Sequence, residues 1–264
     1  MQTNKAQIGV AVPTLNSAAT LDWTLCSLRN QRDIALEIVV ADSGSQDGTL
    51  EICRRWDIPT IHVPAGNMYR AINAVLCRMN TDWVTYLNSD DAVYPQSYAR
   101  LVARGDQEHA SLVYGDCDFV DYEGRFLFLV KSPPPSGLPG MIRLSPLFGG
   151  RVGFAQPAAI YRKSSFQELK GFDEQFRLIA DYDFFFRLVV SGCPVARLAR
   201  PPVAAFRYHA LQMSNREATN LQQELQLFRS TKRVKASPGD WLDVLSWRLR
   251  NSPTYVSRIM RLRP

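Results

Sequence analysis

Residues 37–49 read EIVVADSGSQDGT, an apolar run that ends in a carboxylate and is followed by a turn and a helix start. The run 37–42 predicts a buried strand, and Asp47 is a good N-cap for a helix near 48–56. Capping does not explain Asp42 at the end of the apolar run. Such a carboxylate can accept a hydrogen bond from the imide N–H of uracil or from N1–H of guanine. The stretch therefore indicates a strand–helix unit that carries a binding loop.

The same pattern fills the first hundred residues. Strands are expected at 8–13, 37–42, 60–63 and 83–87, and each is followed by a helix, near 18–30, 48–56, 67–79 and 95–104. Continuous apolar strands that alternate with helices favour a parallel sheet covered on both faces. We therefore predict an α/β fold with a mainly parallel central sheet flanked by helices, and polar strand ends gathered at one ligand-binding edge.

The second half of the chain has a different pattern. Segments 111–121 and 125–130 predict a meander of strands. The proline-rich segment 132–140 predicts an exposed loop without regular structure. Residues 181–192 predict an amphipathic helix, and the chain from about residue 215 onward reads as helical.

Composition excludes several protein classes. The 264 residues are 46% hydrophobic and 21% charged, which is typical of a globular protein rather than a disordered one. No run approaches the roughly 20 apolar residues that cross a bilayer. The five cysteines form no C-x-x-C motif, which favours free thiols. The N-terminus shows no signal-peptide pattern, so we expect a cytoplasmic protein.

The net charge of +6 is concentrated at the C-terminal end. From residue 229 onward, nine Lys/Arg stand against two Asp, a balance of +7 that leaves the first 228 residues near −1. A near-neutral main domain does not favour nucleic-acid binding, so no nucleic-acid partner is expected. The basic end carries Trp241, Leu242 and Leu245, a combination that suits an interfacial helix on an anionic membrane. A solvated helical face is the alternative.

A second group of carboxylates follows the fourth expected strand. Residues 86–91 read YLNSDD and place Asp90 and Asp91 side by side. Mg²⁺ and Mn²⁺ prefer oxygen ligands from one or two carboxylates together with substrate phosphate. The group therefore predicts a metal and diphosphate site, with a turn and a helix N-cap at Asp91 as the alternative.

A third group opens the helix expected at 181–192. Asp181 and Asp183 both lie in its first turn, where the helix dipole favours negative charge. Capping explains one of them. The other is explained by a carboxylate that removes a proton from an attacking hydroxyl.

Taken in order, five motifs resemble the bacterial family 2 glycosyltransferases of the GT-A fold. They read VPTLN, DSGSxDGT, GNMYRAIN, YLNSDD and ADYDxxxRL, and the resemblance covers roughly residues 7–210. It implies one GT-A domain over 1–212, with a nucleotide-binding half to about 110 and an acceptor half over 111–212, before a helical basic C-terminal extension over 213–264. It also implies inverting transfer of a sugar from a nucleotide-diphosphate donor, preferably a UDP-sugar, to a hydroxyl of a glycan or lipid-linked acceptor in cell-surface polysaccharide synthesis.

The resemblance also implies site residues. Asp181 would be the general base, with Asp183 as the less favoured candidate. Asp90 and Asp91 would hold Mn²⁺ or Mg²⁺, although Asn88 replaces the usual first Asp of the D-x-D signature. The nucleotide-binding residues would be Pro13, Thr14, Asn16, Asp42, Gly66, Asn67, Arg70, Asn88 and Ser89. Further candidates are His209 and Ser214 beside the diphosphate, and Arg151 and Gln156 toward the phosphate or acceptor.

Two other functions fit parts of the pattern. A sugar nucleotidyltransferase would share the sheet and the carboxylates, but it should carry a basic glycine-rich loop where this chain reads PTLNSAAT. A non-catalytic nucleotide-sugar-binding protein of the same fold would explain Asn88 as lost metal chemistry. For the enzyme, lipid-linked acceptors would bring the chain to the inner face of the cytoplasmic membrane as a peripheral protein.

Overall fold

The computed structural model describes residues 7–145, 153–209, 217–232, 237–254 and 256. Within them, a seven-stranded sheet has the order β10-β6-β9-β4-β1-β2-β3. Neighbours in β4-β1-β2-β3 run parallel, as do β10 and β6, whereas β9 is antiparallel to both β4 and β6. The predicted mainly parallel central sheet is therefore confirmed. Its strands are β1 (Ile8–Thr14), β2 (Leu36–Asp42), β3 (Thr60–His62), β4 (Trp83–Tyr86), β6 (Leu112–Gly115), β9 (Ala159–Arg162) and β10 (Val195–Leu198).

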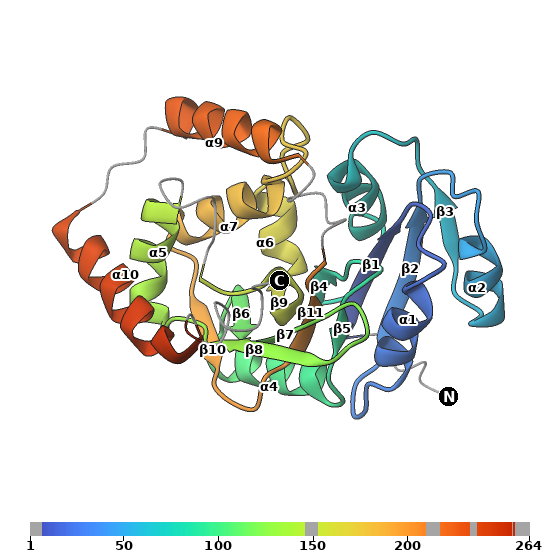
Figure 1. Cartoon of the computed structure of the whole chain (residues 1–264), viewed down its shortest axis with the longest axis horizontal. Helices are drawn as coiled ribbons and strands as arrows, with labels where there is room; N and C mark the ends of the chain where they lie inside the picture. Colours follow the sequence, from blue (N-terminus) through green and yellow to red (C-terminus); the bar gives the residue numbers. More distant parts are fainter. Residues whose placement is uncertain (1–6, 146–152, 210–216, 233–236, 255, 257–264) are drawn as a thin grey trace.

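Helices cover both faces of this sheet (Figure 1). Successive side chains of a strand point to opposite faces of the sheet. In β1, Val10 and Val12 therefore belong to one apolar cluster and Ala11 to the other, so each face has apolar side chains that a helix covers. The first cluster is completed by α1 (Leu21–Arg29), α2 (Thr49–Arg55) and α4 (Ser97–Gln107). The second is completed by α3 (Met68–Leu76), α6 (Lys163–Glu168) and α7 (Ala180–Val190).

A smaller sheet lies beside the first and has the order β5-β11-β7-β8. Strands β7 and β8 form the antiparallel pair expected of a meander, and β11 pairs parallel to β7 and antiparallel to β5. The preceding strand β6 belongs to the large sheet instead. The four strands are β5 (Ala92–Val93), β7 (Cys117–Val120), β8 (Phe126–Val130) and β11 (Ala204–Arg207).

The exposed loop predicted for 132–140 is wrong. A short 3₁₀ turn, η1 (Pro135–Gly137), leads directly into helix α5 (Leu138–Leu144), whose residues Leu138 and Ile142 are fully buried. Proline is tolerated in the first turn of a helix, where its missing N–H has no intrahelical partner. The apolar side chains that follow then bury one face of the helix, which outweighs the turn character of the segment.

Two helices follow the small sheet, as the sequence predicts. Helix α9 (Ala218–Lys232) places Leu225 and Phe228 in the same apolar cluster as α7. Helix α10 (Pro238–Arg250) begins at a capping box formed by Ser237 and Asp240 and packs on α5. The division of the chain at residue 212 stays a prediction.

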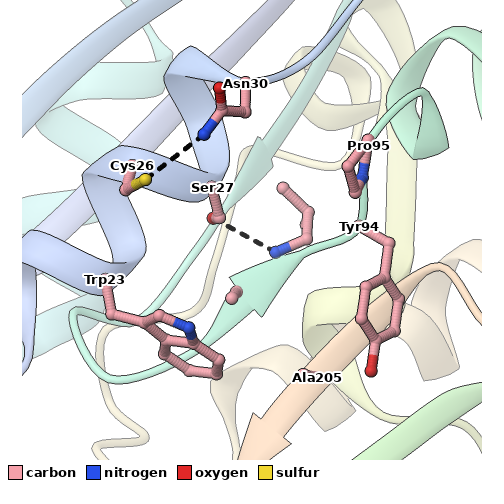
Figure 2. Close-up of a pocket in the computed structure, with 9 residues that line it drawn as sticks. Trp23, Cys26, Ser27, Asn30, Tyr94, Pro95 and Ala205 are labelled. Carbon is pink, nitrogen blue, oxygen red and sulfur yellow. Dashed lines mark hydrogen bonds between the residues drawn. The ribbon is translucent and has the colours of Figure 1, made fainter. Parts of the chain in front are cut away.

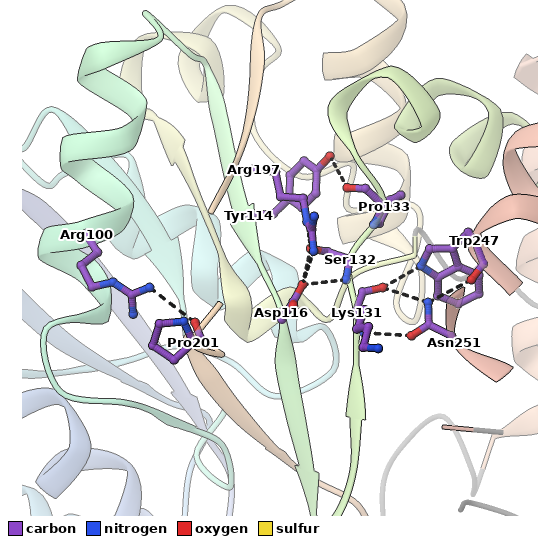
Figure 3. A network of polar contacts seen from close by, with 10 residues as sticks. All are labelled: Arg100, Tyr114, Asp116, Lys131, Ser132, Pro133, Arg197, Pro201, Trp247 and Asn251. Carbon is purple, nitrogen blue, oxygen red and sulfur yellow. Dashed lines mark hydrogen bonds and ion pairs between the residues drawn. The ribbon is translucent and has the colours of Figure 1, made fainter. Parts of the chain in front are cut away.

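The end of α10 is fastened to the small sheet by polar contacts (Figure 3). Trp247 Nε1 donates to Lys131 O at 2.8 Å, and Lys131 N donates to Asn251 Oδ1 at 2.9 Å. These contacts satisfy the backbone of Lys131 where β8 ends. Helix α10 is therefore fixed to the domain by both apolar packing and directional bonds.

None of the described helices is long and apolar enough to cross a membrane. All five cysteines are free thiols, as the sequence indicates, and Cys53 and Cys117 are buried.

Candidate active site

The loops after β1, β2 and β4 meet at the carboxyl edge of the large sheet. Thr14 and Asp42 are partners in the β1–β2 register, and Thr14 Oγ1 donates to Asp42 Oδ1 at 3.0 Å. Ser17 Oγ and Ser89 Oγ are hydrogen-bonded at 2.8 Å. The predicted gathering of polar strand ends is therefore confirmed.

Asp42 organises the loop that follows β2. Its Oδ1 accepts from Thr14 and from Ser45 Oγ, and its Oδ2 accepts from the backbone N–H groups of Gly44 and Ser45 at 2.9 and 3.0 Å. The residue is only 2% exposed. Burial alone would raise the pKa of Asp42, but these hydrogen bonds outweigh it and hold the pKa below its ordinary value. Asp42 is thus an ionised carboxylate held in place by four donors.

Asn16 joins the first two loops. Its Oδ1 accepts from Gln46 N at 2.9 Å, and its own N–H donates to Ser45 Oγ at 2.8 Å. Asn16 has a φ of 53°, a left-handed conformation that asparagine tolerates better than most residues. Pro13 and Thr14 are buried beneath this junction.

The turn after β4 separates its two carboxylates. Asp91 is fully buried; its Oδ2 accepts from Asn88 Nδ2 at 3.2 Å and its Oδ1 from Arg207 N at 2.9 Å. Burial and the neighbouring charge of Asp90 raise the pKa of Asp91. Both oxygens of Asp91 therefore bond within the protein, where they tie β4 to β11, and the structure does not bring this predicted metal ligand to the open edge.

Asp90 points the other way and meets His209. The Asp90 side chain is 25% exposed, and its Oδ2 lies 2.9 Å from His209 Nε2, just after the end of β11. A carboxylate oxygen and an imidazole nitrogen are both suitable ligands for Mn²⁺. Among the described residues no three His, Cys, Asp or Glu side chains group around one point, so a metal held here would take its other ligands from phosphate and water.

Arg207 is a component of this turn that the sequence did not reveal. It is 7% exposed, its Nε donates to Asp90 O at 3.1 Å, and its guanidinium lies 4.3 Å from the centre of the Trp23 ring. The available signal was an arginine directly after the apolar run 203–206. Arg207 therefore holds the backbone of Asp90 in place through its hydrogen bond to the Asp90 carbonyl.

Asp181 lies in the first turn of α7 and contacts Tyr86, the last residue of β4. Its Oδ1 accepts from Tyr182 N at 2.8 Å, and Tyr86 Oη donates to its Oδ2 at 3.4 Å. Burial raises the pKa of Asp181, and hydrogen bonds from Tyr182 N–H, Tyr69 and Tyr86 offset only part of this rise. Tyr86 is the last residue of β4, so its side chain links this carboxylate to the strand that continues into the turn of Asp90.

Gln156 contacts the same strand end. It belongs to the short 3₁₀ turn η3 (Gln156–Ala158), and its Nε2 donates to Tyr86 O at 2.8 Å. This predicted acceptor-side residue therefore binds the backbone where β4 ends.

Asp183 has a different environment. Two residues correspond to about 200° around a helix, so its side chain leaves the opposite face of α7 from that of Asp181. Asp183 is fully buried and pairs with Arg187 at 2.6 Å and with Lys232 of α9 at 3.0 Å. Glu224, also of α9, accepts from the N–H groups of residues 177–179. Helix α9 therefore holds the first turn of α7 on the side away from Asp181.

Asn67 and Arg70 contact the segment that leads into α7. Asn67 caps α3 by accepting from Tyr69 N at 2.9 Å, and its Nδ2 donates to Glu174 O at 2.8 Å. Arg70 pairs with the Glu174 carboxylate at 3.0 Å. Gly66 occupies the exposed turn before α3 with a φ of 127°, where a side chain would be strained. Their nucleotide-binding role stays a prediction.

Two predicted residues, Arg151 and Ser214, lie outside the described residues. A pocket of about 180 Å³ opens between α1 and β5, and Figure 2 shows that its lining includes Trp23, Ser27 and Tyr94. None of the predicted site residues lines it.

Sequence comparison places the chain among glycosyltransferases. A family model described as glycosyl transferase family 2 matches residues 9–170. The succinoglycan biosynthesis protein ExoO of Rhizobium meliloti is 28% identical over 209 residues, which cover 75% of this chain and 59% of ExoO. A PGL/p-HBAD biosynthesis glycosyltransferase of Mycobacterium bovis is 29% identical over 205 residues, which cover 75% of each protein.

Solved structures share the fold at low identity. S. aureus TarS 1–349 in complex with UDP-GlcNAc has a TM-score of 0.64 at 17% identity, covering 97% of this chain and 76% of that one. The mannosyltransferase PcManGT from Pyrobaculum calidifontis, in complex with GDP-Man and Mn²⁺, has a TM-score of 0.61 at 18% identity, covering 93% and 70%. The predicted GT-A fold is confirmed by these likenesses, and the match over more than half of the sequence shows the family. The chain belongs to glycosyl transferase family 2.

Proposed function

We propose that this chain is an inverting glycosyltransferase that moves a sugar from a nucleotide-diphosphate donor, a UDP-sugar by preference, to a hydroxyl of a glycan or lipid-linked acceptor. One observation carries the proposal: Asp181, with its raised pKa, accepts a hydrogen bond from Tyr86, the last residue of the strand that continues into the turn of Asp90. Sugar transfer requires a group that takes the proton from the acceptor hydroxyl and a site that stabilises the departing diphosphate. We assign the first task to Asp181 and the second to the turn of Asp90. The relative named for succinoglycan biosynthesis supports the proposed role in cell-surface polysaccharide synthesis, for which we propose a cytoplasmic location.

The donor is proposed to lie against the joined loops after β1, β2 and β4. Asn16 and Ser89 border this edge, and Asp42, with both of its oxygens bonded within the loops, fixes its shape. Neighbours of the same fold were solved with UDP-GlcNAc and with GDP-Man. These complexes support a nucleotide-sugar at this edge.

Asp90 and His209 are proposed to hold Mn²⁺ or Mg²⁺. Their 2.9 Å separation and partial exposure fit a shared cation that also contacts phosphate. Two neighbours of this fold, PcManGT and a glucosyl-3-phosphoglycerate synthase, were solved with Mn²⁺. When bound, the metal would supply positive charge opposite the departing diphosphate. Arg207 holds the backbone of Asp90 in place whether or not a metal is bound.

Asp181 is proposed to take the proton from the acceptor hydroxyl. The hydroxyl oxygen then bonds to the anomeric carbon as the bond from that carbon to the diphosphate oxygen breaks. In-line attack of this kind inverts the configuration of the carbon. A raised pKa suits the task because a more basic carboxylate accepts a proton more readily.

A thermal-unfolding screen with UDP-, GDP- and dTDP-sugars, each with and without Mn²⁺, tests donor binding, base choice and metal dependence together. We expect one nucleotide series to raise the melting temperature, with a larger rise when Mn²⁺ is present. In Asp90→Ala the additional rise with Mn²⁺ should disappear.

Transfer to a glycan acceptor is then measured with the donor so identified. Metal-stimulated binding without transfer or donor hydrolysis would favour a non-catalytic binding protein. Release of pyrophosphate from a nucleoside triphosphate and a sugar phosphate would identify a nucleotidyltransferase instead.

A further inference from the structure

Helix α10 has two apolar faces, and one of them packs against the described part of the domain. Val244 and Trp247 pack against Met141 and Leu144 of α5, and Asp240 pairs with Arg143 at 3.0 Å. At about 100° per residue, the inward positions 240, 244, 247 and 251 fall within about 60° of one another. One narrow stripe of α10 therefore accounts for its attachment.

The opposite stripe is apolar and exposed. Leu242, Leu245 and Leu249 are 67%, 55% and 65% exposed, and Trp241 at the edge of the stripe is 49% exposed. The three leucines also fall within about 60° of one another, roughly opposite the inward stripe. Single exposed leucines are ordinary on protein surfaces, but a continuous row along one helix face indicates an interaction surface.

Positive charge flanks this row. Arg248 and Arg250 are both exposed, and helix geometry places them on opposite sides of the leucines. They belong to the C-terminal segment in which nine Lys/Arg stand against two Asp. One of those acids, Asp240, is buried in its pair with Arg143, so the exposed side of the helix is more basic than the sequence count suggests.

We propose that the outward face of α10, formed by Leu242, Leu245 and Leu249 with Trp241 at its edge, binds the surface of an anionic lipid bilayer. The helix would lie in the plane of the interface, with its leucines among the acyl chains and Arg248 and Arg250 at the phosphate groups. The exposed arginines complement the phosphate groups of anionic lipid, whereas a second copy would present an identical basic face to this one. The charge of the flanks therefore favours lipid as the occupant. This inference goes beyond the proposed reaction and does not depend on the donor site.

Co-sedimentation of the full chain with vesicles tests the proposal. We expect binding to vesicles of mixed phosphatidylglycerol and phosphatidylcholine, and much weaker binding to phosphatidylcholine alone. Leu245→Asp should lower the affinity for the mixed vesicles by about tenfold or more, because a charge replaces a buried leucine at the interface. The double variant Arg248→Gln/Arg250→Gln should bind the mixed vesicles as weakly as the parent chain binds phosphatidylcholine alone.

Val190→Asp is the matched control, because Val190 is 55% exposed but lies at the end of α7. It should bind the vesicles as the parent chain does, and circular dichroism should show that all variants are folded. The proposal is overturned if the parent chain fails to bind anionic vesicles, or if Leu245→Asp binds them equally well. It is also overturned if sedimentation velocity shows a dimer that Leu245→Asp dissociates while vesicle binding is absent. Donor-induced thermal shifts, measured without vesicles, report separately on the donor site.

Discussion

The carboxyl edge of the large sheet and the first turn of α7 treat their acidic side chains in opposite ways. At the sheet edge, Asp42 accepts four hydrogen bonds from its own loop and from Thr14, and its pKa lies below the ordinary value. At the helix, Asp181 lies beside Tyr69 and Tyr86 and accepts fewer hydrogen bonds, and its pKa lies above that value. The number of donors relative to the loss of water therefore decides which carboxylate stays ionised and which is suited to accept a proton.

The substitution Asp181→Asn tests most directly whether the carboxylate with the raised pKa is the general base. The amide cannot accept the proton of the acceptor, so we expect transfer to fall by about 10²- to 10⁴-fold while donor affinity is retained. Initial rates of transfer and donor-induced thermal shifts measure the two quantities. Near-normal turnover would show that another group is the base.

The neighbouring change Asp183→Asn should act on stability instead. It leaves Arg187 and Lys232 without their buried carboxylate partner, which should lower the free energy of unfolding by about 3 kcal/mol. Urea unfolding of both variants makes the comparison directly. A stable Asp183→Asn protein with lost turnover would transfer the role of base from Asp181 to Asp183.

Asp42→Asn tests the sheet edge. We expect a loss of about 2 kcal/mol in unfolding free energy at pH 7, because charge-assisted bonds to Gly44, Ser45 and Thr14 are weakened. A carboxyl whose pKa is lowered by folding stabilises above its unfolded pKa, near 3.9, and that stabilisation is lost as pH falls through the folded pKa. The difference between the variant and the parent chain in urea unfolding should therefore shrink on acidification below about pH 4. A difference that stays constant with pH would assign the effect to shape rather than charge.

The smallest expected effect comes from Tyr86→Phe. The lost hydroxyl stabilises the ionised form of Asp181, so its removal should raise that pKa further and move the acid limb of the pH–rate profile to higher pH. Activity on that limb should fall by about threefold, because a 3.4 Å bond is a weak one. Tyr98→Phe is the control: Tyr98 is fully buried, and its hydroxyl has no hydrogen-bond partner among the described residues. An equal shift in both variants would indicate a general packing effect.

Strand and helix positions were predictable because they rest on local periodicity. The strands at 8–13, 37–42 and 83–87 lie within a residue or two of their observed bounds. The parallel arrangement followed from their alternation with helices, and it brought Thr14, Asp42 and Ser89 to one edge. The segment 132–140 was mispredicted because its prolines are equally compatible with a turn and with the start of a helix whose apolar face is buried.

By itself, the sequence determined the order of the elements and the carboxylates at their ends, since these depend on residues close together in the chain. Tertiary structure alone decided the surroundings of each carboxylate. Asp91 is buried and accepts a hydrogen bond from Arg207, which lies more than a hundred residues away in the chain. Asp183 forms an ion pair with Lys232 of α9. Ionisation and access depend on partners that folding brings together from distant parts of the chain, so identical residue types two positions apart acquire different chemistry.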